Sequence, residues 1–311
     1  MGLTAAVFPG QGAQSVGMGR DVYDACARSR TVFERANDVL GFDLARVCFE
    51  GPASALEQTD VQQPAIFVVS VALWEALADS QGGRFAFDRA GGLSLGEYTA
   101  LYAAGAFSFD EGLRLVRRRG ELMQKAALAT PSGMASVVGG DEAAVAALCE
   151  KVRKDEVLSP ANFNCPGQVV IAGHKTACDR ASAAAAEFGV RVVPLAVAGA
   201  FHTTIMESAA VGLREMLDQT ALSRPAVPVI SNVDAEYHAD PGETRDRLCR
   251  QLTHPVRWQR CVERMIADGV DRFVEVGPGR VLTGLLRKID RTRTAVNVST
   301  LEALAGVVEM K

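Results

Sequence analysis

A serine set between two glycines is the residue of this chain best placed to do chemistry. The segment Gly92-Leu93-Ser94-Leu95-Gly96 follows a short apolar run and precedes a helical pattern. This arrangement is typical of the strained strand-to-helix turn that exposes a nucleophilic hydroxyl. The flanking residues must be small because the backbone doubles back closely there. The segment therefore predicts acyl transfer at Ser94, with backbone N–H groups and a helix dipole facing the developing charge.

The same segment has a second interpretation. Ser94 and Glu97 have the spacing of a capping box, in which a serine and a glutamate three residues later close the start of a helix. Capping alone would not require Gly92 or Gly96. The partners that a nucleophile needs must therefore be found elsewhere in the chain.

A serine becomes a good nucleophile when a base removes its proton, and histidine is the usual base. Among four histidines, His202 is the best candidate. It ends the apolar segment 197–201 and precedes 204–207, another capping-box pattern, which predicts a second strand-to-helix junction. We expect the other three to be structural or solvated: His174, His238 and His254. Of these, His254 is the alternative base.

One arginine is predicted to point into the protein. On a helix over residues 111–127, Arg119 falls in the middle of the apolar stripe, and the neighbouring charged residues fall on the opposite face. A buried guanidinium is costly without an anion. That anion would be either a structural Asp or Glu or the carboxylate of a substrate, which matches the guanidinium fork equally well.

Composition excludes several classes of protein. The chain has 311 residues, is 48% hydrophobic and carries a net charge of −4, which fits a large core and does not favour binding to nucleic acid. It has no run of about 18 apolar residues and does not begin like a signal peptide. We therefore expect a cytoplasmic protein that does not insert in a membrane. Seven scattered cysteines without zinc spacing predict reduced thiols and no metal site.

The order of predicted elements indicates an α/β fold in two parts. Residues 1–127 and 204–311 alternate short apolar strands with helices, as in a parallel sheet with crossover helices. Residues 128–203 have the order β-α-β-β-α-β, which is ferredoxin-like. We predict a small domain inserted into a larger one, with the active site in the cleft between them. The strands expected in the larger domain cover 5–8, a segment ending near 91, 227–231, 272–276 and 295–298; the helices cover 21–39, 63–77, 111–127, 256–268 and 281–288.

Several segments, in order along the chain, resemble one family, the malonyl-CoA:acyl carrier protein transacylases with the related acyltransferase domains of fatty-acid and polyketide synthases. The segments are 8–12, 92–98, 119–120 with 123–124, 161–164, 200–202, 251–258 and 275–279. The resemblance covers nearly the whole chain. It implies an α/β-hydrolase-like large domain that carries a ferredoxin-like small domain.

The resemblance implies a role for each residue of the site. Ser94 would accept the acyl group and His202 would be its general base, oriented by a main-chain carbonyl in the stretch from Gln251 to Pro255. The backbone N–H groups of Gln11 and Leu95 would form the oxyanion hole. The residues implied to bind substrate are Arg119, for the malonyl carboxylate, and Gln63, Met123, Asn162 and Phe201, the last in an Ala-Phe-His segment linked to malonyl rather than methylmalonyl substrates. Many members have a histidine where this chain has Leu93.

The implied reaction carries malonyl from malonyl-CoA to Ser94 and then to the phosphopantetheine thiol of an acyl carrier protein. It needs no cofactor and would supply fatty-acid synthesis. The alternatives are an acyltransferase of a polyketide pathway, a serine thioesterase and an inactive interaction module. We expect a monomer. An acidic carrier protein would bind a basic cluster, either Arg287, Lys288, Arg291 and Arg293 or, alternatively, Arg114 and Arg117.

Overall fold

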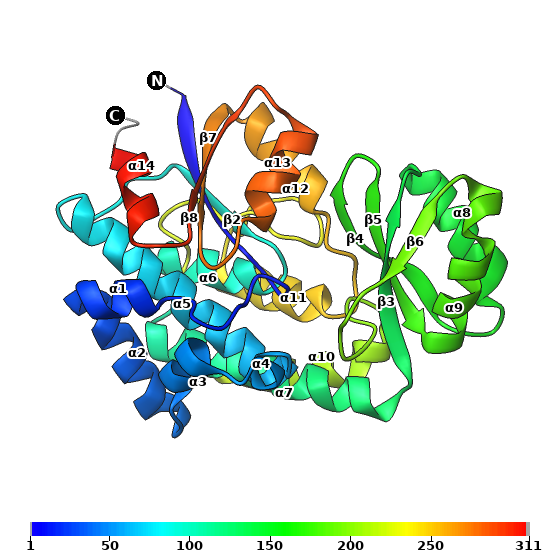
Figure 1. Ribbon diagram of the computed structural model, residues 1–311, viewed down its shortest axis with the longest axis horizontal. Helices are drawn as coiled ribbons and strands as arrows, with labels where there is room; N and C mark the ends of the chain where they lie inside the picture. The colour runs from blue at the N-terminus through cyan, green and yellow to red at the C-terminus, as the bar shows by residue number, and fades with distance from the viewer. Residues whose placement is uncertain (1, 309–311) are drawn as a thin grey trace.

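A four-stranded parallel sheet lies at the centre of the larger part of the molecule, in the computed structural model that describes residues 2–308 (Figure 1). The strand order is β2-β1-β7-β8, with β2 at Arg89–Gly92, β1 at Leu3–Phe8, β7 at Val270–Val276 and β8 at Thr294–Val298. All residues of β1 except the first are buried, because helices cover both faces of a parallel sheet. The central strands therefore consist almost entirely of apolar residues.

The strand predicted over 227–231 is wrong. Two isolated bridges replace it: Val229 pairs with Ala90 of β2, and Ile230 pairs with Tyr237. Pro228 has no N–H to donate to a ladder, and prolines are confined to the edges of sheets for this reason. Only its carbonyl takes part, as the acceptor for the N–H of Ala90.

Helices surround this sheet, and α5 (Thr59–Ser80) is the most buried of the long ones. By length and composition it is the one helix among residues 2–308 that could cross a bilayer, but 89% of its most apolar window is buried inside the fold. It is therefore a core helix. The others in this part are α1 (Arg20–Ala25), α2 (Ala27–Leu40), α3 (Leu44–Glu50), α4 (Ala53–Leu56), α6 (Leu95–Ala103), α7 (Phe109–Ala129), α10 (Glu207–Gln219), α11 (Pro241–Gln251), α12 (Trp258–Ala267), α13 (Val281–Ile289) and α14 (Ala305–Val308), with short 3-10 helices η2 (Thr204–Met206) and η3 (Glu302–Leu304).

The helix predicted over 21–39 is interrupted. It forms α1 and α2, because Cys26 between them has an extended backbone with φ −117° and ψ 119°. The other four helices predicted in this part occur, and their observed bounds differ by only a few residues at each end.

The smaller part has its own antiparallel sheet, on the right in Figure 1. Its order is β4-β5-β3-β6, the ferredoxin-like arrangement of a β-α-β-β-α-β chain. Two helices and a 3-10 turn pack on the sheet over a separate apolar cluster. The elements are β3 (Ser132–Val138), α8 (Glu142–Arg153), β4 (Leu158–Cys165), β5 (Gln168–His174), α9 (Lys175–Ala184), η1 (Ala185–Phe188) and β6 (Arg191–Pro194). All of them lie inside the predicted segment 128–203.

Two connections fix the small sheet against the larger part. Helix α7 runs along the lower edge of the molecule and leads directly into β3 (Figure 1). On the other side, β4 pairs with the segment before α12: Phe163 N–H donates to the carbonyl of Val256, and Val256 N–H donates to the carbonyl of Ala161, both at 2.8 Å. The small part is therefore attached to the larger part on both sides of the cleft between them.

A buried carboxylate holds α13, the helix that borders this cleft. Glu275 at the end of β7 is 1% exposed and accepts from the N–H groups of Leu282 and Thr283 and from the Thr283 hydroxyl, at 2.6 to 2.9 Å. These are N–H groups that the first turn of a helix cannot satisfy internally. Glu275 thus anchors the start of α13 and, with it, the cleft residues that α13 carries.

Candidate active site

The turn that carries Ser94 lies between β2 and α6 and is strained. Ser94 has φ +54° and ψ −101°, a conformation that residues other than glycine rarely adopt. A Cβ atom on Gly92 would lie 2.0 Å from the carbonyl carbon of Gly96, and one on Gly96 would lie 2.0 Å from the carbonyl oxygen of Phe8. The close approach of the backbone explains why both flanking positions are glycine.

The capping interpretation of this segment is wrong. The side chain of Ser94 makes no cap hydrogen bond to α6, because its Oγ instead meets the side chains of His202 and Arg119. Glu97 is fully buried and bonds to other parts of the chain. The strain at Ser94 therefore presents its hydroxyl to partners distant in sequence.

His202 is in contact with Ser94, as predicted for its base. The distance from Ser94 Oγ to His202 Nε2 is 2.9 Å, and His202 Nδ1 lies 2.6 Å from the carbonyl oxygen of Gln251. Because a carbonyl can only accept, Nδ1 carries the proton and Nε2 is left as the acceptor for the serine O–H. The orienting group is the main-chain carbonyl that the resemblance implied.

The local structure around His202 differs from the prediction. Residues 195–203 form an irregular segment instead of a strand, and His202 has φ +63°. Thr203, not Thr204, caps the following turn, with its side chain accepting from the N–H of Ile205. The positive φ turns the ring toward Ser94, so here too backbone strain places a functional side chain.

Burial and a neighbouring charge keep His202 neutral. The ring is 4% exposed. Burial is the larger cause and the charge of Arg119 the second, and together they lower the pKa of His202 from 6.5 to about 4, although the bond to Gln251 opposes the shift. At neutral pH the imidazole is therefore unprotonated and able to accept a proton from Ser94.

Arg119 points inward as the periodicity of α7 predicts and is 1% exposed. Its Nη2 lies 2.9 Å from both Ser94 Oγ and Gln251 Oε1, and its Nη1 lies 2.7 Å from Gln63 Oε1. No Asp or Glu in the described range 2–308 forms an ion pair with it. Burial lowers the pKa of Arg119, while nearby Tyr98 and Glu97 oppose this shift. The guanidinium of Arg119 therefore lacks the structural Asp or Glu partner that was one of the two possibilities from the sequence.

The two predicted oxyanion donors lie beside the nucleophile. Leu95 is the first residue of α6, a position whose N–H has no acceptor within the helix. Gln11 lies in the turn after β1 and lines the same cavity as Ser94. The chain after β1 passes so close to the nucleophile turn that a Cβ on Gly10 would lie 2.2 Å from the carbonyl oxygen of Leu93. Their role as oxyanion donors stays a prediction that this placement supports.

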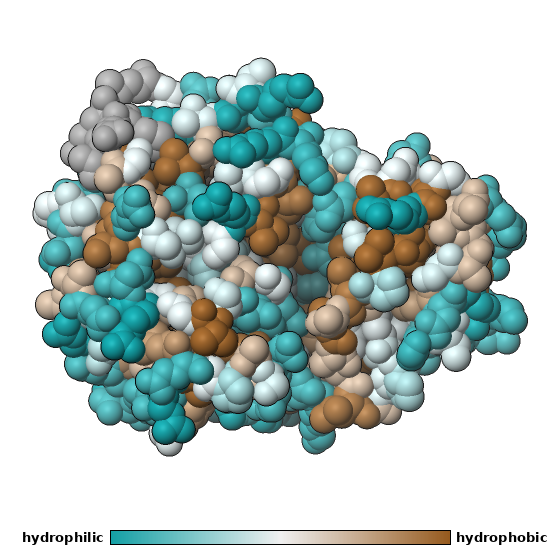
Figure 2. All heavy atoms as spheres, viewed as in Figure 1, coloured by the Kyte–Doolittle hydropathy of each residue, from teal (hydrophilic) through white to brown (hydrophobic). Residues whose placement is uncertain are grey.

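Ser94 and His202 line a cavity of about 180 Å³ between the two parts of the molecule. Figure 2 shows the surface hollowed there, with apolar side chains on both sides. Met123, Asn162 and Phe201 line this cavity, as expected for substrate contacts. Leu93 also lines it. The remaining lining residues are Gln11, Met134, Asn164, Gln168, Val170, Leu195, Val197, Val281 and Leu285.

Gln63 and Arg119 differ from the other predicted substrate contacts, because neither of them lines the cavity. Gln63 is 1% exposed behind it, with its Oε1 bound to Arg119 and its Nε2 3.3 Å from Met123 Sδ. Its observed contacts orient Arg119 and Met123 and do not reach the cavity.

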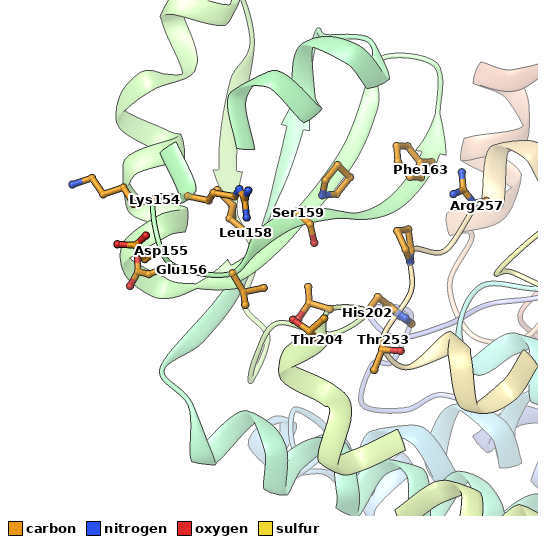
Figure 3. A pocket seen from close by; sticks show the side chains of 15 residues that line it. Lys154, Asp155, Glu156, Leu158, Ser159, Phe163, His202, Thr204, Thr253 and Arg257 are labelled. Carbon is orange, nitrogen blue, oxygen red and sulfur yellow. The ribbon is translucent and has the colours of Figure 1, made fainter. Parts of the chain in front are cut away.

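His202 also borders a second, wider cavity of about 810 Å³, shown in Figure 3. Thr204 and Thr253 lie near His202, Ser159 comes from β4, and Lys154 and Asp155 lie at the end away from His202 (Figure 3). Ser94 lines only the smaller cavity. An acyl group that reacts with Ser94 must therefore occupy the smaller one.

Three residues of the site escaped prediction. Asn232 accepts from the N–H of Ser94 at 2.6 Å and donates to the carbonyl of Gly92 at 2.8 Å. The spacing of Glu97 predicts a capping box, and His238 is expected at a structural or solvated loop position. The two side chains meet in the core at 2.9 Å. No local pattern marks these residues, because their partners are more than 130 positions away in the chain.

The other histidines do not reach Ser94. His174 accepts from the N–H of Val157 in the small sheet, and His254 is exposed and bonds to the carbonyl of Arg250. Neither is placed to act as the base. The seven cysteines are all unpaired, as expected, and no group of three or more metal-ligating side chains occurs in the described part of the chain.

Comparison with known proteins gives a consistent result. Residues 6–307 match the model of the acyl transferase domain family. The chain is 44% identical over 305 residues to malonyl CoA-acyl carrier protein transacylase of Salmonella typhimurium, covering 98% of each, and 39% identical to the Bacillus subtilis protein of the same name, covering 99% and 97%.

Solved structures agree. An acyl carrier protein S-malonyltransferase from Vibrio cholerae superimposes with a TM-score of 0.93 at 43% identity, covering 98% of this chain and 99% of that one. A malonyl-transacylase solved in complex with a type II PKS acyl-carrier protein gives a TM-score of 0.96 at 40% identity, covering 99% and 100%.

The reactivity of Ser94 should follow the protonation of His202. Only the neutral ring accepts the serine proton, so labelling of Ser94 by a fluorophosphonate should be constant from pH 8 to about 5 and should fall about tenfold per unit below pH 4. Arg119→Leu should move this fall to higher pH, because the charge of Arg119 is one cause of the low pKa.

Circular dichroism at each pH is the control for this experiment. The folded pKa of His202 lies below its unfolded value, so the unfolded chain binds the extra proton and stability declines as pH falls from 6.5 toward 4. A loss of labelling centred near pH 6.5 in folded protein would contradict the assignment.

Proposed function

The chain belongs to the acyl transferase family, among the malonyl-CoA:acyl carrier protein transacylases, and we propose that it transfers malonyl from malonyl-CoA to a carrier-protein thiol through an ester on Ser94. One observation carries this proposal. A buried guanidinium lies 2.9 Å from the nucleophilic oxygen and, within residues 2–308, has no carboxylate partner of its own. An acyl group with a free carboxylate supplies that partner when its carbonyl reaches Ser94.

The first half-reaction forms the ester. Ser94 Oγ attacks the thioester carbonyl while His202 Nε2 takes its proton. The oxyanion of the tetrahedral intermediate faces the N–H groups of Leu95 and Gln11. When the C–S bond breaks, CoA leaves as the thiol with the proton that His202 held. The malonyl group remains as an ester on Ser94.

The second half-reaction reverses these steps with another thiol. His202 removes the proton of the phosphopantetheine thiol, and the sulfur attacks the ester carbonyl. The C–O bond breaks, Ser94 Oγ recovers the proton from His202, and the malonyl thioester of the carrier protein leaves. No oxidation state changes in either half, and His202 and the N–H groups of Leu95 and Gln11 serve proton transfer and the oxyanion, so we infer that the chain needs no redox cofactor or metal ion for this reaction.

The alternatives explain fewer of the contacts. A thioesterase would share the strained serine turn and the histidine, but it has no use for Arg119 beside the nucleophile. An inactive interaction module has no need for strain at both Ser94 and His202. The apolar side chains of the cavity, among them Leu195, Val197 and Val281, suit the long pantetheine arm that CoA and the carrier protein share.

We also propose the setting in which the protein works. We propose a monomer, because Ser94, His202, Arg119 and Gln251 meet within a single chain and need no group from a second copy. Seven unpaired cysteines fit the reducing cytoplasm. We assign the product to fatty-acid synthesis. The likeness to a transacylase solved with a type II PKS acyl-carrier protein makes a polyketide pathway the alternative.

For the carrier protein we propose a docking surface on and after α13. Arg287, Lys288 and Arg291 are exposed, and Lys288 Nζ lies 3.3 Å from Gln168 Oε1, a group that lines the cavity of Ser94. The fourth member of the predicted cluster, Arg293, forms ion pairs with Asp271 and Asp290. The alternative cluster is also neutralised: Arg114 pairs with Asp110, and Arg117 with Glu121.

Labelling tests the proposed function directly. Radiolabelled malonyl-CoA should label the wild-type protein within seconds at one malonyl group per chain, lose that label slowly to water and lose it quickly to a phosphopantetheinylated carrier protein. Ser94→Ala should bind no label and should still fold, because the Ser94 side chain makes no cap bond to α6. Rapid release of free malonate would indicate a hydrolase, and a wild-type protein that never labels would indicate an inactive module.

Arg119→Ala should destroy the preference for malonyl. It removes a charge-assisted contact that acetyl cannot use, so the malonyl-to-acetyl ratio of kcat/KM should fall by roughly 10² or more, since leaving a buried carboxylate unpaired costs about 3 to 5 kcal/mol. Arg119→Lys should recover only part of the ratio because a point charge does not reproduce the fork. A parallel loss of both activities together with a large fall in melting temperature would contradict the carboxylate-binding role.

Charge reversal tests the docking surface. Arg287→Glu, Lys288→Glu and Arg291→Glu combined should raise the KM for carrier protein about tenfold or more at low salt while leaving the KM for malonyl-CoA within about twofold, because rim charges mainly affect encounter. The matched control is the same reversal of Arg114 and Arg117. An unchanged KM for carrier protein in the triple variant would exclude this surface.

A further inference from the structure

Beneath Ser94 lies a pair of titratable side chains that the reaction itself does not use. The side chains of Glu97 and His238 are both 0% exposed, and Glu97 Oε1 is 2.9 Å from His238 Nε2. Glu97 is in the first turn of α6, and His238 lies in the loop before α11. Burying a carboxylate is costly unless its oxygens are hydrogen-bonded. The arrangement of its bonds therefore indicates what the carboxylate does.

The second oxygen of Glu97 holds Gln251 by its side chain and Asn232 by its backbone. Oε2 accepts from the backbone N–H of Asn232 at 2.9 Å and from Gln251 Nε2 at 2.8 Å. With its Nε2 held by Glu97, Gln251 presents its Oε1 to Arg119 and its main-chain carbonyl to His202. Asn232 presents its Oδ1 to the N–H of Ser94. Through Gln251 and Asn232, one carboxylate oxygen thus holds groups that bond to Ser94, His202 and Arg119.

Glu97 also supplies negative charge to a site in which Arg119 contacts no carboxylate of the described residues. Gln251 connects the two charges, because its Nε2 donates to Glu97 and its Oε1 accepts from Arg119. The charge of Glu97 opposes the lowering of the Arg119 pKa by burial. An uncompensated guanidinium next to His202 would disfavour the imidazolium that forms as Ser94 loses its proton.

His238 is the third hydrogen-bond donor to the carboxylate of Glu97. Its Nδ1 has no hydrogen-bond partner within residues 2–308, so a doubly protonated ring would bury an unpaired N–H. The neutral ring with its proton on Nε2 leaves only a lone pair unmatched and donates to Oε1 of Glu97. With Asn232 and Gln251, it brings the donors to the carboxylate to three.

We propose that Glu97 and His238 form a positioning pair for acyl transfer: Glu97 provides the internal counter-charge of Arg119 and orients Gln251 and Asn232, and His238 holds Glu97 in that role. This inference rests on the proposed function. It assigns a task to two residues that touch neither substrate nor the reacting atoms. The pair acts through Gln251 and Asn232.

Glu97→Gln removes the charge of this side chain and keeps its shape. The amide oxygen can accept from Asn232 and Gln251, and the amide N–H₂ can donate to His238 Nε2 once that ring shifts its proton to Nδ1, so the contacts of Glu97 are kept and its charge is lost, at the cost of an unpaired N–H on His238 Nδ1. In single-turnover labelling, the rate constant for acylation of Ser94 should fall on the order of tenfold, the effect of about one pK unit on the imidazolium. The malonyl-CoA concentration that gives half the maximal rate should not rise, because Arg119 keeps its charge for the substrate carboxylate.

Two variants of His238 test the donor. His238→Leu removes the N–H that faces Glu97 and should slow acylation as Glu97→Gln does. His238→Gln places an amide N–H at a similar reach and should restore most of the rate that leucine removes. The matched control is His254→Leu, which removes an exposed histidine with no contact to the pair and should leave the rate unchanged.

The outcomes separate this inference from the proposed function. If wild-type protein never labels with malonyl-CoA, the proposed function fails. If it labels normally and either Glu97→Gln or His238→Leu acylates at the wild-type rate, the positioning pair is wrong. A purely structural role would lower the rate and raise the half-saturating concentration together, with a fall in melting temperature that His238→Gln does not reverse; that result would also overturn the inference.

Discussion

The buried positive charge of Arg119 is the constraint on which the rest of the site depends. A guanidinium that is 1% exposed and contacts no carboxylate among the described residues must be held by neutral oxygens, and the side chains of Gln63, Gln251 and Ser94 provide them. Its charge also acts on the base, since it is one cause of the low pKa of His202. In the function that we propose, the charge that binds the anionic acyl group thus also keeps the base neutral until the substrate carboxylate arrives.

The choice of orienting group for His202 follows from this constraint. A carboxylate in contact with His202 would raise its pKa and would place an anion beside the region that must accept malonyl. The main-chain carbonyl of Gln251 fixes the same tautomer without a net charge. The negative charge of the site is instead one residue further away, at Glu97, where Gln251 separates it from Arg119. In the proposed function, this separation leaves room beside Arg119 for the carboxylate of the substrate in addition to the charge of Glu97.

The two-part architecture assembles these groups from separate elements. Ser94 comes from the turn before α6, Arg119 from α7 and Gln251 from the end of α11. His202 follows the small sheet at the point where the chain returns to the larger part. Since α7 leads into β3 and β4 bonds to the segment before α12, the small part is attached on both sides of the cavity. The positions of the four groups thus depend on how firmly the two parts are joined.

Much of this arrangement could be predicted from local patterns. The inward face of α7 follows from helical periodicity, which placed Arg119 in the core, and the glycines around Ser94 predict a turn whose crowding the structure confirms. The β-α-β-β-α-β order of residues 128–203 indicated the small antiparallel sheet. These inferences hold because each rests on residues within one element, where spacing alone decides which side chains share a face.

Contacts between distant segments were decided only by the tertiary structure. Glu97 satisfies a capping-box spacing, but the competing donors on Asn232, Gln251 and His238 lie more than 130 positions away. The segment 227–231 has the composition of a strand, yet it forms isolated bridges, since Pro228 has no N–H for a ladder. Amino-acid types and their spacing therefore determined which groups could do chemistry. Packing determined which hydrogen bonds each group makes, because a buried polar atom bonds to whatever the fold brings within reach.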